Sequence, residues 1–245
     1  MDDQTQDIAV LEGLTDPAEV RAAARSLEHL EDDVEILLFV APGCPSCPHQ
    51  VRSVATMALA SPRIGLEIVD VTREPELADR YEVRSVPTTV VDDELIMVGV
   101  VPAGDLAWRL VERQGPQAEK MVFEALVTAG RHADAAERLA DGRATGAFLE
   151  LWSRSTLEGR MGLLLVAEEA LLFDPEGLDP LVPDLVAGLE GDGPLAGDDA
   201  RRGDTADLLG RIGHLDALPV LERLTRDANP EVAEAAVEAL EELTG

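Results

Sequence analysis

Two cysteines separated by two residues, Cys44 and Cys47, are the side chains of this sequence best suited to covalent chemistry, and the sequence contains no other cysteine. They follow a short apolar run and precede a segment with helical periodicity, which predicts that they lie at a helix N-terminus. Unpaired backbone N–H groups there stabilise an anion, so we expect a lowered pKa for the Cys44 thiol. Because a thiolate is the species that attacks a disulfide, this spacing favours thiol–disulfide exchange.

The two cysteines are predicted to have different roles. Cys44 would attack a substrate disulfide, and Cys47, one helical turn further in, would attack the resulting mixed disulfide and release the substrate. Pro45 and Ser46 lie between the cysteines and are expected to shape the site. Pro45 suits the first helical position, where its missing N–H costs nothing.

Two other interpretations of the cysteine pair compete with exchange chemistry. A structural zinc ion takes four protein ligands, but the four histidines of the sequence do not form a second ligand pair with the right spacing. We therefore predict no metal. The pair could also be a relic in an inert binding module, because a fold does not guarantee an activity.

Strand-like and helix-like segments alternate through the first half of the sequence and would place the cysteines between a strand and a helix. Asp16 and Pro17 are typical of a helix start. Pro87 precedes a strand, a position that tolerates proline. The predicted order is one helix followed by the pattern βαβαββα. The predicted strands span residues 34–40, 65–71, 88–91 and 95–100, and two of the helices span residues 75–81 and 104–112.

A break at residues 114–116 ends this pattern, so we predict a domain boundary near residue 115. The predicted domains span residues 1–115 and 116–245. The second domain is rich in Ala, Leu, Arg and Glu with helical periodicity, which predicts an all-α fold. Residues 210–240 resemble a HEAT-like repeat. Stacked helix pairs of this kind either extend a scaffold or bind a partner protein, and we favour partner binding.

The sequence is strongly acidic, with 49 Asp and Glu against 20 Lys and Arg and a net charge of -29. Such a surface repels phosphate backbones and anionic lipid headgroups, which argues against binding to nucleic acids or membranes. A high-salt habitat and a GC-rich genome would each account for this composition. The first residues lack the pattern of a secretory signal, and the apolar runs are too short to span a bilayer, so we expect a cytoplasmic protein.

Three groups of residues in the first half carry a resemblance to a known family. They are Phe39, Val40, Pro42, Cys44, Pro45, Cys47 and Pro48; residues 75–81 with Val83, Arg84, Val86 and Pro87; and Val98 with Gly99. On these residues, the segment 34–108 resembles the thioredoxin superfamily. More narrowly, it resembles the C-terminal half of glutaredoxin-like protein disulfide oxidoreductases and the N-terminal domain of the alkyl hydroperoxide reductase flavoprotein.

This resemblance implies an α/β thioredoxin fold, with a mixed four-stranded sheet and flanking helices, followed here by the HEAT-like helices. It implies that Cys44 is the nucleophile, that Cys47 is the resolving thiol and that Pro87 is a cis-proline beside them. The backbone of Val86 is expected to pair with a bound peptide. The sequence departs from the family at Leu37, where a buried acid often helps to deprotonate the second cysteine. Residues 1–31 are also too short to form a second thioredoxin unit.

The function predicted from these observations is that of an enzyme, a thiol–disulfide oxidoreductase that reduces or exchanges protein disulfides. The sequence lacks the G-x-G-x-x-G fingerprint, so we expect no nicotinamide or flavin cofactor. An upstream reductase or a small thiol would then supply the electrons. Two alternatives stay open. One is a redox-sensing or inert adaptor whose helical half binds a partner protein, and the other is an electron carrier dedicated to a peroxidase.

Overall fold

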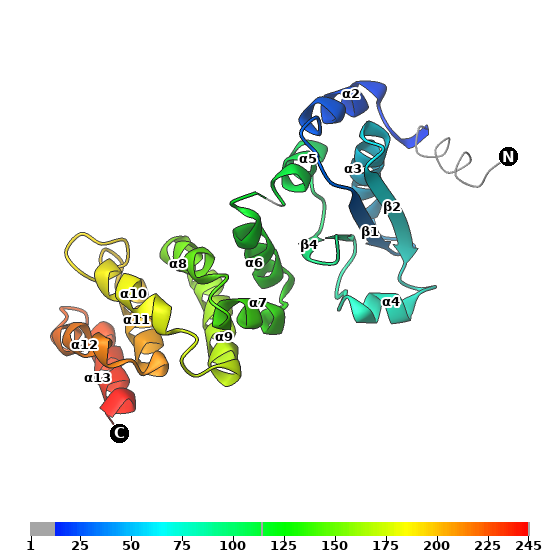
Figure 1. Ribbon diagram of the computed structural model, residues 1–245. Helices are drawn as coiled ribbons and strands as arrows, with labels where there is room; N and C mark the ends of the chain where they lie inside the picture. Colours follow the sequence, from blue (N-terminus) through cyan, green and yellow to red (C-terminus); the bar gives the residue numbers. More distant parts are fainter. Residues whose placement is uncertain (1–12, 114, 245) are drawn as a thin grey trace. The chain divides into compact units, whose positions relative to one another are not determined.

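The computed structural model describes residues 13–113 and 115–244. Its contacts divide the chain into two compact units, of which the first ends at Ala129 and the second begins at Gly130. The first unit contains strands and helices, and the described part of the second contains helices only (Figure 1). No helix among the described residues is long and apolar enough to cross a membrane.

A four-stranded mixed sheet forms the centre of the first unit, with the strand order β2-β1-β3-β4. Strand β1 pairs in parallel with β2 and antiparallel with β3, and β3 pairs antiparallel with β4. Because β1 lies between two neighbours, it is apolar along almost its whole length, as buried strands usually are. The strands are β1 (Val34–Val40), β2 (Ile64–Asp70), β3 (Thr88–Val91) and β4 (Leu95–Val98).

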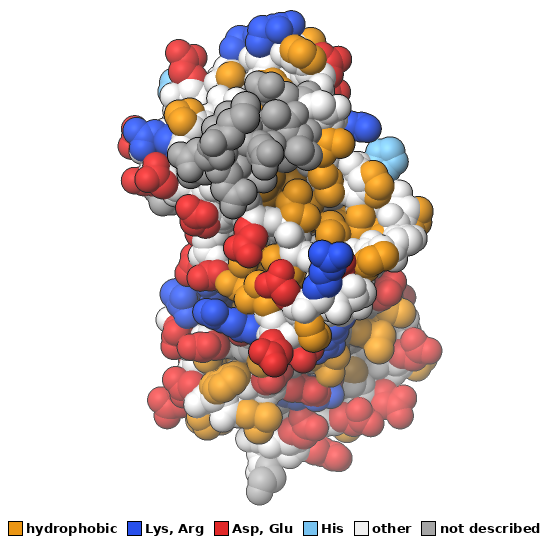
Figure 2. All heavy atoms as spheres, turned by 90° about the vertical axis from the view of Figure 1, so that its right-hand side faces the viewer, with side chains coloured by type: hydrophobic (Ala, Val, Ile, Leu, Met, Phe, Trp, Pro, Cys, Tyr) orange, Lys and Arg blue, Asp and Glu red, His pale blue; other side chains and the backbone are white. Residues whose placement is uncertain are grey.

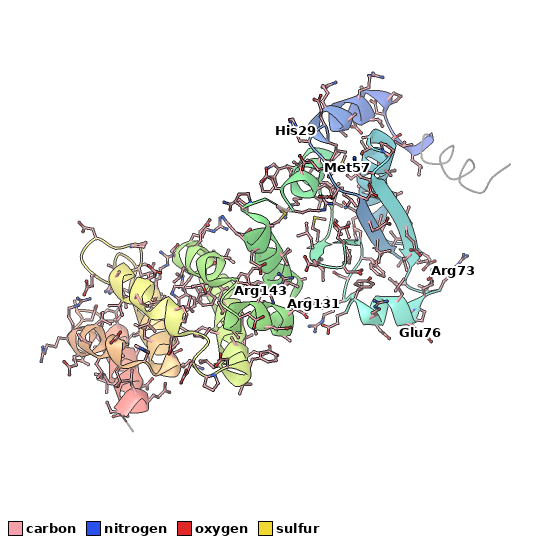
Figure 3. All side chains as sticks on the ribbon, viewed as in Figure 1. His29, Met57, Arg73, Glu76, Arg131 and Arg143 are labelled. Carbon is pink, nitrogen blue, oxygen red and sulfur yellow. A yellow bond between two sulfur atoms is a disulfide. The ribbon has the colours of Figure 1, made fainter. Side chains whose placement is uncertain are left out.

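Five helices accompany this sheet in the described residues of the first unit. Helices α2, α3 and α5 pack on one another, and α3 also packs on β1 and β2. The buried side chain of Met57 lies on α3 within this core (Figure 3). The order of elements agrees with a helix followed by βαβαββα. The helices are α2 (Pro17–Ser26), α3 (Cys47–Ala60), α4 (Pro75–Arg80), α5 (Ala103–Glu112) and α6 (Ala118–Ala129).

Helix α2 begins as its sequence predicts. The Ala18 N–H donates a hydrogen bond to the Asp16 carboxylate over 2.7 Å, and Pro17 occupies the first helical position. This cap satisfies one of the N–H groups that a helix start leaves unpaired. The cap therefore fixes where α2 begins, and α2 then packs along α3, the helix that carries Cys47.

The turn between α5 and α6 lies where the sequence breaks. Gly115 donates its N–H to the Glu112 carbonyl oxygen, and Ala118 then donates to Gly115. Helix α6 packs on β4, so the contacts group it with the first unit. A division of the chain into a redox domain and a helical domain near residue 115 stays a prediction.

The second unit consists of helices that pack in successive pairs. Helix α7 packs on α9, and α11 packs closely on α13. A Cβ atom on Gly210 would lie 2.6 Å from the Ala239 Cα, so glycine at this position permits the close approach of α11 and α13. The helices are α7 (His132–Ala140), α8 (Thr145–Arg154), α9 (Leu157–Phe173), η1 (Asp179–Leu181), α10 (Val182–Gly188), α11 (Asp199–Ile212), η2 (Leu215–Ala217), α12 (Leu218–Leu224) and α13 (Pro230–Thr244).

The segment that resembles a HEAT-like repeat, residues 210–240, contains the end of α11, the turn η2, helix α12 and most of α13. Gly213 ends α11 in the left-handed conformation, with φ of 74°, which glycine adopts at little cost. The 3-10 turn η2 follows, and Pro219 stands in the first turn of α12. Helix α13 packs on both α11 and α12, whereas the assignment to the HEAT family stays a prediction.

A partly buried ion pair connects the start of α11 with the turn before α13. Arg202 donates two hydrogen bonds to Asp227, at 2.9 and 3.0 Å, and a third to Asp199 at 2.8 Å. The hydrogen bond from Arg202 lowers the pKa of Asp227 from its ordinary value. A carboxyl group whose pKa is lower in the folded state stabilises the fold above its unfolded pKa. That contribution is lost as the pH falls through the folded pKa.

We predict that Asp227→Asn destabilises the second unit by about 2 kcal/mol at neutral pH, because Arg202 loses a partner at a site with little solvent. Between about pH 4 and pH 2, the variant should also lose less stability than the parent. The measurement is denaturant unfolding followed by fluorescence of the buried Trp152, in a Trp108→Phe background that leaves one tryptophan.

The matched control is Asp141→Asn, which removes a carboxylate from an exposed pair with Arg143 in the same unit. Exposed pairs contribute little, so this variant should change the free energy of unfolding by less than about 0.5 kcal/mol. Equal effects of the two substitutions would contradict a stabilising role for the Arg202–Asp227 pair.

Candidate active site

The cysteine pair lies where β1 ends and α3 begins. Residues 41–43 form the connecting turn, in which Cys44 donates its N–H to the Ala41 carbonyl oxygen over 3.3 Å. Gly43 has φ of +80°, a conformation that side-chain-bearing residues seldom adopt, so glycine is needed to bring Cys44 to the helix start. Cys44 and Cys47 form a disulfide with their Cα atoms 5.5 Å apart. The structure therefore holds the pair in its oxidised state.

The two sulfur atoms differ in their access to solvent. Cys47 is 5% exposed, whereas Cys44 is half-buried, and both residues line an open pocket. Cys44 is therefore the more accessible of the two cysteines. This asymmetry supports the roles predicted for them, with Cys44 as the attacking residue and Cys47 as the resolving one.

Polar groups of the first turn of α3 surround the Cys44 sulfur. The Cys47 N–H donates a hydrogen bond to Cys44 Sγ over 3.1 Å, and Ser46 Oγ lies 3.6 Å from the same atom. Ser46 is the residue before α3 and makes no capping bond with its side chain, so its hydroxyl is available to Cys44. In the reduced protein, both donors would stabilise a negative charge on Cys44 Sγ.

The loop before β3 forms the other side of the site. The Val86–Pro87 peptide bond is cis, as the resemblance implies. The Val86 carbonyl oxygen lies 3.6 Å from Cys44 Sγ. Two hydrogen bonds hold this loop, one from Thr88 Oγ1 to the Ser85 carbonyl oxygen and one from the Gly99 N–H to the Pro87 carbonyl oxygen. The backbone of Val86 therefore lies beside the sulfur that a substrate would reach.

All six residues that the sequence singled out for the site come together in the structure. Cys44, Cys47 and Ser46 are within contact of one another, and Val86 borders Cys44. Pro45, between Cys44 and Ser46 in the chain, is exposed on the surface of the site, and Pro87 is buried beneath it.

Gln50 is a residue that sequence reasoning missed. Its side chain is fully buried, donates to Thr89 Oγ1 over 2.8 Å and accepts from the Val101 N–H over 2.7 Å. It thereby connects α3 to β3 and to the segment before α5. A polar residue three positions after Cys47 could have drawn attention, because an amide on the inner side of a helix needs partners. The sequence alone does not say which partners these are.

No carboxylate stands behind the cysteines at the position where relatives often have one. Leu37 lies half-buried in β1, and the nearby Glu35 is exposed, with its backbone N–H donating to Asp92. Among the described residues, no cluster of three or more His, Cys, Asp or Glu side chains could hold a metal ion.

We predict that Gln50→Leu lowers the stability of the first unit by about 2 kcal/mol, because the half-buried Val101 N–H and the buried Thr89 hydroxyl lose their partner. The reaction of Cys44 with disulfides should also slow, since the link between α3 and β3 is lost. Denaturant unfolding and the rate of insulin reduction measure the two effects.

The control for this prediction is Thr56→Val, which removes a buried hydroxyl whose bond to the Arg52 carbonyl oxygen stays within α3. This change should cost less than about 1 kcal/mol and leave the exchange rate unaltered. If both variants keep the parent's exchange rate, Gln50 does not position the site.

Comparisons with known proteins agree with this geometry. Residues 33–112 match the family model described as a thioredoxin domain. The chain is 34% identical over 67 residues to thioredoxin from Methanocaldococcus jannaschii, a match that covers 27% of this chain and 79% of that protein. The residues that match the family model include both cysteines, the cis-proline loop and the four strands.

Two solved structures are also similar to part of the chain. One is the N-terminal domain of alkylhydroperoxide reductase from Enterococcus faecalis, with 26% identity, a TM-score of 0.34, and coverage of 36% of this chain and 42% of that one. The other is a protein disulfide oxidoreductase from Aeropyrum pernix, with 23% identity, a TM-score of 0.28, and coverage of 44% and 42%. This chain thus spans about two fifths of each solved structure. On the sequence match to thioredoxin and the geometry of the cysteine pair, the chain belongs to the thioredoxin family.

Proposed function

We propose that this protein is a thiol–disulfide oxidoreductase that reduces protein disulfides through Cys44 and Cys47. The observation that carries the proposal is the arrangement of an accessible Cys44 sulfur, a buried Cys47 sulfur bonded to it and the Val86 carbonyl oxygen 3.6 Å away. A disulfide that only stabilised the fold would not need one sulfur at the surface beside a cis-proline loop.

The reaction begins with the dithiol form of the protein. The Cys44 thiolate attacks one sulfur of a substrate disulfide, so that a Cys44–substrate bond forms and the other substrate sulfur leaves as a thiolate. Cys47, deprotonated, then attacks Cys44 Sγ. The Cys44–Cys47 disulfide forms and the second substrate sulfur is released. The substrate gains two electrons, the protein loses two, and the released thiolates take up protons from solvent.

The protein's own residues help each step. The Cys47 N–H and the Ser46 hydroxyl stabilise the Cys44 thiolate before attack. During regeneration a reductant thiol attacks Cys44 and expels Cys47, and the same donors then help Cys44 to leave the mixed disulfide with the reductant. The backbone at Val86 is positioned to pair with the substrate segment that carries the attacked sulfur. An extended substrate segment bound in this way would align the two sulfur atoms of its disulfide with Cys44 Sγ for exchange.

Regeneration of the dithiol requires an external reductant. The proposed donor is an upstream protein reductase or a small thiol. A cytoplasmic location is part of the proposal, because a dithiol of this kind is kept reduced where thiols predominate. A carrier that passes electrons to one peroxidase would use the same chemistry with a single partner, and the breadth of substrates reduced distinguishes it from a general reductase.

A second candidate function is that the helical unit binds a partner protein. Helix α9 carries five large apolar side chains that are exposed among the described residues, Phe173 included. The spacing of the other four, by four and seven positions, places them on one side of the helix. They are Leu157 (59% exposed), Met161 (60%), Leu165 (51%) and Leu172 (87%). Such a row is typical of a contact surface, and it would let the second unit hold the protein that the first unit reduces.

We predict that the protein accelerates the reduction of insulin disulfides by dithiothreitol and that Cys44→Ser abolishes this activity, because the attacking sulfur is lost. Cys47→Ser should also stop turnover but accumulate mixed disulfides, since the resolving sulfur is absent. Turnover is followed by insulin precipitation, at low and high salt, and the mixed disulfides by mass spectrometry.

The two variants control for each other, because each replaces one sulfur by oxygen at neighbouring positions. Circular dichroism verifies that both are folded. Turnover that persists in Cys44→Ser, or mixed disulfides that form on Cys47 instead of Cys44, would contradict the proposed roles. No turnover by the folded parent at either salt concentration would favour the adaptor or the dedicated carrier.

A further inference from the structure

An apolar pocket of about 340 Å³ adjoins the disulfide. Neither Val86 nor Pro87 lines it, so it is separate from the surface that the cis-proline loop provides. The pocket is large enough for an aliphatic or aromatic side chain. Its lining consists of Leu14, Val40, Ala41, Gly43, Cys44, Cys47, Pro48, Val51 and Arg52.

Arg52 is the one charged side chain among the residues that line this pocket. It is exposed, and its Nε–H donates to the Leu14 carbonyl oxygen over 3.2 Å. No ion pair links it to a carboxylate of the described residues. By contrast, Arg113, Arg160 and Arg202 each lie against an aspartate. The terminal nitrogens of Arg52 are therefore available to a carboxylate that comes from outside the chain.

The chain segment that supplies most of the pocket lining contains no carboxylates. Residues 36–66, which include β1 from Ile36 onward, the cysteine turn and α3, contain no Asp or Glu, although these make up 49 of the 245 residues. Residues 83–91, around the cis-proline, contain none either. On the face that Figure 2 shows, carboxylates are spread widely and hydrophobic side chains lie among them in several places. A substrate carboxylate thus meets less repulsion at the redox site than elsewhere on this acidic protein.

We infer that the pocket selects the substrate segment: it binds an apolar side chain next to the attacked cysteine, while Arg52 binds a carboxylate one or two residues away. The inference rests on the proposed exchange function, because it names the class of substrate for the same site. The occupant is a segment of a protein disulfide, since the pocket adjoins Cys44 and has room for a side chain as well as the sulfur.

The experiment compares peptide disulfides that differ at one position. The reference peptide has leucine before its cysteine and glutamate two residues after it. A second peptide has glutamine in place of the glutamate, and a third has serine in place of the leucine. The full-length protein is reduced and freed of reductant, and the second-order rate of disulfide cleavage is measured by acid quenching and chromatography at about 0.15 M salt, where long-range repulsion is largely screened.

We expect Arg52→Gln to lower the ratio between the cleavage rates of the glutamate peptide and the glutamine peptide by about threefold to fivefold. This factor corresponds to the free energy that one exposed charge pair contributes. The control Arg63→Gln makes the same change in net charge. Arg63 pairs with Asp33 near the other end of β1, so this control should leave the ratio unchanged. Val51→Ala should reduce the preference for leucine over serine by about twofold, because it shortens the pocket wall.

Three outcomes would overturn the inference. The first is that the parent and Arg52→Gln show the same ratio between the cleavage rates of the glutamate peptide and the glutamine peptide. The second is that Arg52→Gln slows the cleavage of hydroxyethyl disulfide, which is neutral and small, by the same factor as it slows the cleavage of the glutamate peptide. Arg52 would then act on Cys44 and not on the substrate. The third is the same dependence on Arg52 with oxidised glutathione and no preference for leucine, which would indicate a small carboxylate-bearing disulfide instead of a protein segment.

The same experiment separates this inference from the proposed function. If hydroxyethyl disulfide and all peptides are cleaved at rates that do not depend on leucine, glutamate or Arg52, the exchange function stands and the selective pocket is rejected. If the reduced protein cleaves none of these disulfides, the exchange function is rejected and the inference falls with it.

Discussion

The site depends on the position of one atom, Cys44 Sγ. The glycine turn after β1 brings it to the first turn of α3, where the Cys47 N–H reaches it at 3.1 Å, and the pairing of β3 with β1 brings the Val86 carbonyl oxygen to 3.6 Å. One contact comes from a helix start and the other from a loop some forty residues later in the chain. The sheet and helices of the first unit therefore bring two features to one sulfur. One is a set of hydrogen-bond donors that stabilise a thiolate, and the other is a backbone segment that can hold a substrate.

Gln50 shows how this arrangement is kept in place. The side chain uses both ends of its amide in the core, one on Thr89 of β3 and one on the backbone at Val101. A fully buried amide is tolerated only when it is paired in this way, and it then specifies how the helix sits on the sheet. Because Thr89 lies two residues after Pro87, the same bonds that fix α3 also fix the cis-proline loop. Packing of apolar side chains alone would allow α3 more freedom along its axis.

Much of the first unit could be predicted from the sequence because its signals are local. Apolar runs, the cap at Asp16 and the cysteine spacing each report on neighbouring residues, and the strands and helices lie within about two residues of the predicted bounds. The contacts of Gln50 and the pocket at Arg52 could not be predicted, because they join segments far apart in the chain. The grouping of α6 with β4 is of the same kind, since it depends on packing that the break at residue 115 does not reveal.

The proposed exchange reaction requires the two cysteines to differ in reactivity once the disulfide is reduced. The direct measurement is the rate at which iodoacetamide alkylates each cysteine in the reduced protein, with peptide mass spectrometry to assign the products. We predict that Cys44 is alkylated first and that Cys47, which is 5% exposed, stays largely unmodified in the folded protein. Alkylation of Cys47 as fast as Cys44, or before it, would contradict the assignment of Cys44 as the attacking residue.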